Sequence, residues 1–247
     1  MVARMVDRGR SLFRLWVSYR VRAIQERQLA PFTSTRFGTL VFVGVDLVRY
    51  AKWRLLGLPA KAPVVTLDRY QLLDCAVGSA PSTGLWLEFG VLSGNSINYI
   101  SQRTKQPLFG FDSFEGFPER WAPWFPAGTY SGGGVLPEVL PGVTLIKGWF
   151  DQTLPAFLRA RPEERVAFLH VDCDLYSSTL TVLTNLGHRI AEGTVIVFDE
   201  FCGLMPDDEA RAWREFCRKN RVSFRWLGCS LPGAVAIQVT SAARTTK

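Results

Sequence analysis

Residues 85–96 read LWLEFGVLSGNS, an apolar run followed by a turn with two glycines. This pattern predicts a buried strand that turns sharply into a helix, because glycine permits the tight backbone turn at the strand end. Glu88 stands where a dinucleotide-binding motif has its first glycine, and a carboxylate there would repel a pyrophosphate. A cationic ligand therefore fits this turn better than NAD does, although a purely structural turn would need the same glycines.

Along the rest of the chain, short apolar runs alternate with helical stretches. The apolar runs are 85–89, 107–111, 143–146, 166–171 and 194–198. Helical patterns fill 96–103, 154–161, 178–190 and 207–220, and two last strands follow at 222–227 and 234–239. Near-continuous apolar strands alternating with helices predict a parallel sheet covered on both faces, and the short final turn makes the last pair antiparallel. The sequence thus predicts a doubly wound, mostly parallel α/β sheet of seven strands, with the last strand antiparallel.

Positive charge is confined to the first quarter of the chain. The net charge is +7, yet residues 1–61 hold 12 Lys/Arg against 3 Asp/Glu, which leaves 17 against 19 for residues 62–247. We therefore expect a basic helical extension, 1–61, followed by one domain, 62–247. Apolar periodicity predicts helices at 12–28 and 37–58 in the extension. The arginine-rich first helix either packs on the domain or, through residues 1–36, contacts a membrane surface, an acidic partner or another copy of the chain.

Targeting and cysteine patterns favour a cytoplasmic protein. Arginines interrupt the apolar residues near the N-terminus, unlike in a secretory signal. The most apolar run, 37–48, falls short of the roughly 20 residues that span a bilayer. Five scattered cysteines show no disulfide or zinc spacing. The slightly acidic domain also argues against a nucleic-acid substrate.

The second strand of the domain ends at Asp112, twenty-four residues after Glu88. An acidic side chain at that strand end, about 20 residues past a glycine-rich turn, is placed to accept hydrogen bonds from ribose hydroxyls. Together with the carboxylate at Glu88, this predicts a site for a nucleoside without a pyrophosphate. S-adenosylmethionine is the candidate, because its adenosine offers a ribose and its sulfonium tolerates nearby carboxylates.

Four acidic residues end two strands that we expect to be neighbours. Asp172 and Asp174 are two residues apart at one strand end and share a face, while Asp199 and Glu200 end the next strand. Neighbouring strands lie about 4.8 Å apart, so Asp172 and Asp199 should meet at the edge where open α/β sheets bind ligands. Clustered carboxylates indicate a hard divalent cation such as Mg²⁺, which would make a hydroxyl more acidic. The structural alternatives are a capped helix start after Asp174 and loop carboxylates in water.

Four runs of sequence together resemble a known family. They are LEFGV from residue 87, GFDSFEGFP from 110, VDCDLYSST from 171 and GTVIVFDE from 193. In order and spacing, from about Thr66 to Val239, they are similar to the macrocin-type class I methyltransferases, which include sugar O-methyltransferases of macrolide and aminocoumarin biosynthesis. The resemblance implies a Rossmann-like class I methyltransferase fold, S-adenosylmethionine as methyl donor and Mg²⁺ as metal.

The same resemblance implies roles for individual residues. Asp174 would be the general base, with Asp172 beside it as a second catalytic residue. The metal would be held by Asp172, Asp199 and Glu200, although many relatives have Asp where this chain has Glu200. The donor would be bound at the strand ends by Glu88, Gly90, Gly94, Ser96, Asp112, Ser113, Gly148, Trp149 and Asp172.

Three local features complete the sequence-based expectations. His170 shares a strand face with Asp172 and is either a hydrogen-bonded core histidine or part of the site. The aromatic stretch from Trp121 to Tyr130 is either a mobile lid over the acceptor or a packed surface loop. A further helix is predicted at 66–77, with Thr66 as its N-cap.

These observations predict an S-adenosylmethionine-dependent, Mg²⁺-assisted O-methyltransferase. Its acceptor would be a hydroxyl of a small polyhydroxylated or glycosylated metabolite, and the chain would form a homo-oligomer such as a dimer. Two alternatives stay open. One is a metal-independent methyltransferase with another acceptor, and the other is a non-enzymatic protein that keeps the fold and binds a membrane or partner through its N-terminal helix.

Overall fold

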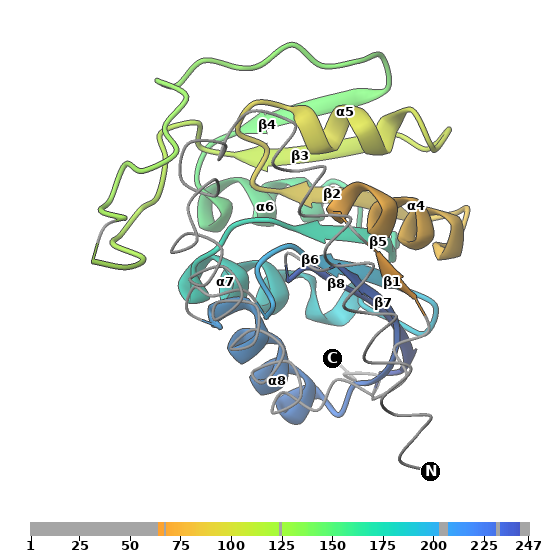
Figure 1. The fold of residues 1–247 in the computed structure, drawn as a ribbon. Helices are drawn as coiled ribbons and strands as arrows, with labels where there is room; N and C mark the ends of the chain where they lie inside the picture. Colours follow the sequence, from red (N-terminus) through yellow and green to blue (C-terminus); the bar gives the residue numbers. More distant parts are fainter. Residues whose placement is uncertain (1–63, 67, 124, 203–206, 231–232, 243–247) are drawn as a thin grey trace, which may run out of the picture. The chain divides into compact units, whose positions relative to one another are not determined.

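The computed structural model describes residues 64–66, 68–123, 125–202, 207–230 and 233–242 (Figure 1). All of them belong to one compact unit, Leu56–Lys247. The helices predicted at 12–28 and 37–58 lie outside the described residues. The proposed basic extension therefore stays a prediction.

One sheet of eight strands forms the centre of this unit (Figure 1). Its order is β1-β7-β8-β6-β5-β2-β3-β4. The strands are β1 (Val65–Thr66), β2 (Leu85–Phe89), β3 (Leu108–Asp112), β4 (Val143–Lys147), β5 (Val166–Val171), β6 (Val195–Phe198), β7 (Ser223–Ser230) and β8 (Val235–Ser241). The described pairings are parallel except those of β8, which runs antiparallel to both β6 and β7. Apart from the short edge strand β1, this is the predicted seven-stranded, Rossmann-like class I methyltransferase fold.

Helices cover both faces of the sheet because side chains alternate along each strand. The helices are α4 (Arg69–Ser79), α5 (Asn95–Ser101), α6 (Phe150–Arg159), α7 (Tyr176–Leu186), the 3₁₀ helix η1 (Gly187–Arg189) and α8 (Asp208–Asn220). On one face, Trp86 stacks on Phe168 at 4.9 Å within a buried cluster that includes α4 and α5 residues. On the other, Phe89 stacks on Phe111 at 4.7 Å and meets Phe150 of α6 edge-on at 5.1 Å. Helix α7 contacts both α6 and α8.

The start of α4 differs from the prediction. Thr66 caps no helix: it lies in β1, paired in parallel with β7, and its Oγ1 donates a hydrogen bond to the carbonyl oxygen of Asp68 at 2.8 Å. Its β-branched side chain suits a strand, which explains the difference. Asp68 is the N-cap, and its carboxylate accepts the backbone N–H of Gln71 at 2.9 Å. The helix therefore begins at Arg69.

The segment between β3 and β4 has little regular structure. Within its described residues, 113–123 and 125–142, there is one isolated bridge between Ala122 and Phe125 and no helix. Helix α6 begins at Phe150, four residues before the predicted start, because the Phe150 ring packs on the sheet. The irregular segment between β3 and β4 and the earlier start of α6 both add residues at the carboxyl edge of the sheet.

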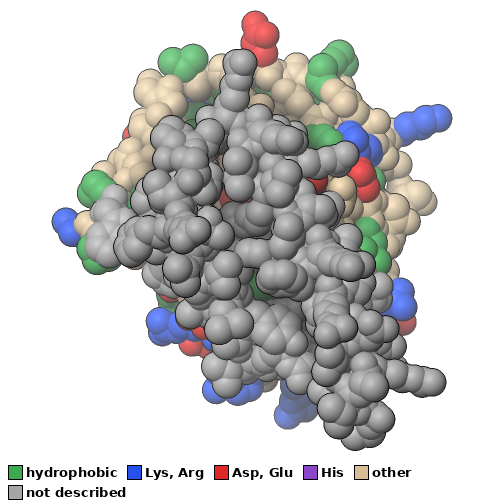
Figure 2. Space-filling view, in the orientation of Figure 1, with side chains coloured by type: hydrophobic (Ala, Val, Ile, Leu, Met, Phe, Trp, Pro, Cys, Tyr) green, Lys and Arg blue, Asp and Glu red, His purple; other side chains and the backbone are tan. Residues whose placement is uncertain are grey.

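The described surface carries mixed charges. In Figure 2, basic, acidic and apolar side chains are interspersed around the visible described residues. This agrees with the near balance of 17 Lys/Arg against 19 Asp/Glu in residues 62–247. None of the helices within the described ranges is long and apolar enough to cross a membrane.

Candidate functional site

Backbone hydrogen bonds extend the sheet by one residue beyond four strand ends. Their N···O distances are 2.9 or 3.0 Å, and they run from Gly90 to Phe111, from Asp172 to Phe89, from Asp199 to Val171 and from Gly148 to Asp112. The first residue after each of these strands is thus held by the strand beside it. The predicted site residues are brought together by the sheet itself.

A cavity of about 800 Å³ lies at these strand ends. Such a volume falls within the range of small-molecule sites, roughly 300–1,000 Å³. The predicted site residues that line it are Gly90, Ser96, Asp112, Ser113, Trp149, Asp172, Asp174, Asp199 and Glu200. Three predicted donor residues, Glu88, Gly94 and Gly148, are not in its lining.

Gly90 is required by a close approach of two backbones. Its φ is +90°, and a Cβ built on it would lie 1.8 Å from the carbonyl oxygen of Asp172. The turn continues through Leu92, at φ +47°, to Gly94, the N-cap of α5 at φ +79°. The glycines therefore let the loop pass the residue that starts the acidic loop and enter the helix.

Glu88 is fully buried, which differs from the expectation that it contacts the donor. Its Oε1 accepts a hydrogen bond from Ser96 Oγ at 2.9 Å, and its Oε2 lies 2.9 Å from His170 Nδ1. The register pairs Glu88 directly with His170 across β2 and β5, so the two side chains share one sheet face. Of the two interpretations of His170, the structure supports the hydrogen-bonded core histidine. Glu88 is placed to position Ser96 and His170 rather than to touch a ligand.

Asp112 faces the glycine loop from the end of β3. Its Oδ2 accepts the backbone N–H groups of Val91 and Leu92, each at 2.8 Å, and its Oδ1 accepts that of Phe114 at 2.7 Å. A carboxylate oxygen can accept two hydrogen bonds, so Oδ1 keeps capacity for a hydroxyl donor. Asp112 is thus held rigidly in the cavity wall while retaining the acceptor that a ribose would need.

Ser113 and Trp149 reach the cavity from β3 and from the start of α6. Ser113 Oγ accepts the backbone N–H of Glu115 at 3.1 Å, and Trp149 is the N-cap of α6. Gly148 precedes it at φ +138°, where a Cβ would lie 2.8 Å from Cγ2 of Thr153. The role of Gly148 in this structure is to make the turn that presents Trp149.

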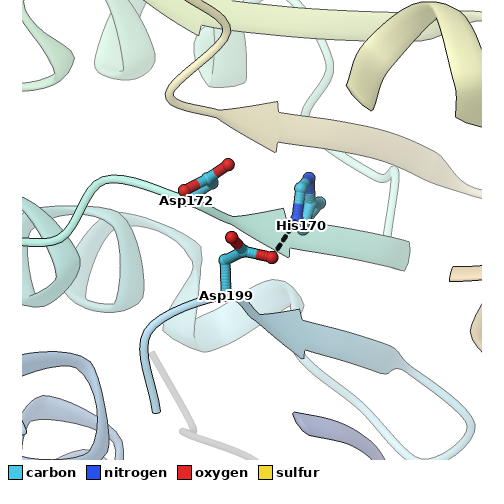
Figure 3. A group of neighbouring side chains, drawn as sticks. All are labelled: His170, Asp172 and Asp199. Atoms are coloured by element: carbon cyan, nitrogen blue, oxygen red, sulfur yellow. Dashed lines mark ion pairs between the residues drawn. The ribbon is translucent and has the colours of Figure 1, made fainter. Parts of the chain in front are cut away.

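Asp172 and Asp199 face one another from the ends of β5 and β6 (Figure 3). The Oδ2 atoms of both contact one nitrogen, Nη1 of Arg69, at 3.1 and 2.7 Å. On its other side, Oδ1 of Asp199 lies 3.9 Å from His170 Nε2. No pattern in the sequence places Arg69 in this site, because it belongs to a helix more than 100 residues earlier in the chain.

This group fits a hard divalent cation on three observations. An oxygen of Asp172, an oxygen of Asp199 and a ring nitrogen of His170 lie within 4.8 Å of one another, and the two carboxylates are the ligands that suit a hard cation. Oδ1 of Asp199 is buried and has no hydrogen-bond partner among the described residues, although buried polar atoms normally have one. Arg69 already holds a positive charge between the two carboxylates, so the site stabilises a cation. Glu200 lines the same cavity.

Asp174 and Glu200 are connected by a buried carboxylate that sequence reasoning missed. Glu209 of α8 is fully buried and accepts the backbone N–H of Asp174 at 3.2 Å and that of Glu200 at 3.0 Å. Asp174 has φ +59°, a conformation that costs a non-glycine residue about 1–3 kcal/mol and persists only where the surroundings hold it. A signal existed, since Glu209 shares the apolar face of its helix with Trp213 and Phe216, at offsets of four and seven residues.

The acids of the cluster differ in their proton affinity. Burial, followed by the charge of Asp199, raises the pKa of Asp172 well above its ordinary value and that of Asp174 to about 7. Burial acts on Asp199 in the same direction, but the two neighbouring cations outweigh it and lower its pKa. Burial opposes protonation of His170, yet the carboxylates of Asp199 and Glu88 raise its pKa to about 10. Asp199 is therefore ionised, and Asp174 can exchange a proton near neutral pH.

The aromatic stretch after β3 packs on itself beside the cavity. Phe117 meets Tyr130 edge-on at 5.4 Å and Trp121 at 5.7 Å, and Trp121 lies 5.3 Å from Phe125. Phe117 and Tyr130 line the cavity. This segment therefore supplies an aromatic wall, and its motion as a lid stays a prediction.

Comparisons with known proteins match this chain to O-methyltransferases. The family model Macrocin-O-methyltransferase (TylF) matches residues 139–225. The 8-demethyl-8-(2,3-dimethoxy-alpha-L-rhamnosyl)-tetracenomycin-C 4'-O-methyltransferase of Streptomyces olivaceus is 28% identical over 148 residues, 53% of this chain and 55% of its own length. Mycinamicin III 3''-O-methyltransferase of Micromonospora griseorubida is 26% identical over 151 residues, 53% of this chain and 58% of its own length. The chain thus spans somewhat more than half the length of these relatives.

Among solved structures, CalS11, a calicheamicin methyltransferase, aligns with a TM-score of 0.48 and 19% identity over 88% of this chain and 85% of its own. The segment matched by the family model contains Asp172, Asp174, Asp199 and Glu200. The family model and the two curated relatives confirm the resemblance of this chain to the macrocin-type O-methyltransferases.

Proposed function

We propose that this chain is an S-adenosylmethionine-dependent O-methyltransferase, assisted by Mg²⁺, that acts on a hydroxyl of a small polyhydroxylated or glycosylated metabolite. The observation that carries the proposal is a single cavity lined both by the glycine loop with Asp112 and by the acids Asp172, Asp174 and Asp199. A donor site and a proton acceptor would share one space. Both curated relatives are named as O-methyltransferases, one of them for a rhamnosyl compound, which supports a sugar hydroxyl as acceptor.

The donor would lie along the glycine loop. Gly90 and Ser96 line this side of the cavity, and Oδ1 of Asp112 can accept a hydrogen bond from a ribose hydroxyl. Trp149 stands at the start of α6, where an apolar adenine face would meet it. Glu88 would act indirectly by fixing Ser96. The nearby carboxylates would favour the positive sulfonium of the donor.

Asp174 would take the proton of the acceptor. A base with a pKa of about 7 is ionised in half of the molecules at neutral pH and can still hold a proton, which suits general base catalysis. As the O–H bond breaks, the acceptor oxygen takes the methyl group from the sulfonium, and S-adenosylhomocysteine leaves as a neutral thioether at sulfur. Asp172 and Asp199 would hold Mg²⁺ with Glu200, and the bound metal would supply charge that makes the acceptor hydroxyl more acidic.

Donor binding is the first test. Calorimetry of the full chain with S-adenosylmethionine should give a dissociation constant in the micromolar range, and Asp112→Ala should weaken it. Asp74→Ala, a change to an exposed acid of α4 paired with Arg103, should bind the donor as the wild type does. No donor binding at high micromolar concentration would refute the proposed activity.

Metal dependence is tested separately. Asp199→Ala should abolish release of S-adenosylhomocysteine from a panel of glycosylated acceptors while largely preserving donor binding. An excess of chelator should abolish transfer in the wild type. Full activity in chelator would refute the metal part and favour the metal-independent alternative.

The remaining expectations concern localisation, oligomeric state and the contacts of the N-terminal segment. We propose a cytoplasmic homo-oligomer and a membrane or partner contact through residues 1–36. Light scattering after size-exclusion chromatography gives the oligomeric state. A full chain with Arg14, Arg22 and Arg27 changed to Glu should lose flotation with anionic liposomes if these arginines bind a membrane. Retained flotation would contradict that contact.

A further inference from the structure

Arg69 enters the acidic cluster from an element that supplies none of its acids. It is the first residue of α4, whose start is fixed by the Asp68 cap, and its side chain is 32% exposed. Its Nη1 atom contacts Oδ2 of Asp172 at 3.1 Å and Oδ2 of Asp199 at 2.7 Å. One cationic atom therefore bridges two carboxylates from different strands, as a metal bound by both would do.

The guanidinium and a metal ion would need the same oxygens. Mg²⁺ binds carboxylate oxygens at about 2.0–2.1 Å and tolerates little distortion. A cation bound to Oδ2 of both Asp172 and Asp199 would fall in the space that Nη1 of Arg69 fills, and the two positive charges would repel one another. The second oxygen of Asp199, Oδ1, points to His170 Nε2, and both atoms are buried with no hydrogen-bond partner among the described residues.

Asp172 and Asp199 need a positive charge between them, whether Arg69 or a metal ion supplies it. Asp174 stands two residues from Asp172, and Glu209 lies fully buried behind the loops that carry Asp174 and Glu200. Without a bridging positive charge, Asp172 and Asp199 could both be ionised only at the cost of mutual repulsion in a partly dry site. A released Arg69 side chain also has somewhere to go, because it lines the cavity and a third of its surface already faces solvent.

We propose that Arg69 is a built-in counter-ion that competes with the divalent cation for the place between Asp172 and Asp199. In the metal-free chain Arg69 holds the two carboxylates together, and metal binding displaces it. Metal affinity is therefore lowered by the free energy needed to release Arg69 from its two carboxylates. This inference rests on the metal part of the proposed function.

Direct measurement of Mn²⁺ binding tests the competition without donor, acceptor or catalysis. The full chain is titrated with Mn²⁺ and free metal is followed by electron paramagnetic resonance. Arg69→Met keeps an unbranched apolar stem and removes the charge, so it should bind Mn²⁺ about tenfold more tightly than the wild type, the factor expected for one hydrogen bond to a charged group. Arg103→Met is the matched control, because Arg103 has the same side-chain exposure, 32%, and pairs with an acid outside the cluster. It should bind as the wild type does.

Thermal melting provides a second readout. In chelator, Arg69→Met should melt below the wild type, and saturating Mn²⁺ should raise its Tm more than that of the wild type. If circular dichroism shows that Arg69→Met is unfolded, Arg69→Gln takes its place with the same expectations.

Two outcomes would overturn the inference. Equal or weaker Mn²⁺ binding by the uncharged variant would mean that Arg69 does not compete with the metal. No Mn²⁺ binding by either protein would remove the metal site altogether. Donor binding by calorimetry and transfer in the presence of Mg²⁺ report independently on the methyltransferase activity, so a failure of the competition is distinguishable from a failure of the proposed function.

Discussion

Replacing the proposed general base should abolish catalysis and stabilise the fold. In the folded chain, burial and the charge of Asp199 raise the pKa of Asp174 to about 7 from an ordinary value of 3.8. Folding therefore favours the protonated carboxyl, and its contribution to stability is fully present below pH 3.8 and is lost as the pH rises through about 7. Asp174→Asn keeps the shape of the side chain and has no charge to bury. Above pH 7 the variant should be the more stable protein.

The pKa difference sets the magnitude. Each pH unit corresponds to about 1.4 kcal/mol, so a difference of about three units gives an upper limit of about 4 kcal/mol. Asp174 is only partly buried and lines the cavity, so solvent screens its charge. We therefore expect Asp174→Asn to gain about 1–2 kcal/mol over the wild type between pH 5 and pH 8.

Urea unfolding in chelator at pH 5 and pH 8 measures this gain. The free energy of unfolding of Asp174→Asn minus that of the wild type should increase with pH, while the same difference for Asp74→Asn, a change to an exposed acid, should not. Methyl transfer by Asp174→Asn should be undetectable, and donor binding should persist. A stability difference that stays constant or falls with pH would refute the reasoning about the pKa, and retained transfer would refute the role as base.

The remaining predictions concern the buried framework of the site. Gly90→Ala should lose roughly 3 kcal/mol or more of stability and all donor binding, because its Cβ would lie 1.8 Å from the carbonyl oxygen of Asp172; a soluble variant that binds the donor in calorimetry would contradict this. His170→Gln should lose about 3–5 kcal/mol below pH 6.5, since it leaves Glu88 buried without its cation. Because the pKa of His170 is raised to about 10, that loss should shrink as the pH rises toward 10, and urea unfolding that shows an equal loss at pH 6.5 and 10 would refute the charge pair. Ser96→Ala removes one hydrogen bond to Glu88 and should cost about 1 kcal/mol in the same assay, and an unchanged midpoint would show that the bond adds no stability.

Strand positions could be predicted from the sequence where the strands are buried on both faces. The bounds of β2 and β5, 85–89 and 166–171, are those of the apolar runs, because such strands are continuously apolar and end at polar or glycine residues. Strand β7 extends to Ser230, three residues beyond its predicted end. Cys229 and Ser230 pair with β1, which lies more than 160 residues earlier, and no local pattern shows such a partner.

The candidate site was predictable only as far as strand order and strand ends define it. Asp172 and Asp199 follow adjacent strands, so their proximity follows from the parallel pairing. The burial of Glu88 depends on register, because the residue directly across β5 is a histidine that can pair with it. Arg69 reaches the cluster through the packing of α4, which only the tertiary structure determines.

The hydrogen bonds that extend the sheet beyond its strand ends hold some parts of the cavity wall more firmly than others. They fix where the donor loop and the acidic loops leave the sheet, whereas the backbone–backbone hydrogen bonds of the described residues in 115–137 stay within 114–137. Acceptor preference could therefore change by exchange of that segment while the spacing of Gly90, Asp172 and Asp199 is retained. For protein engineering, this makes 115–137 the region to diversify and the strand-end residues the ones to leave untouched.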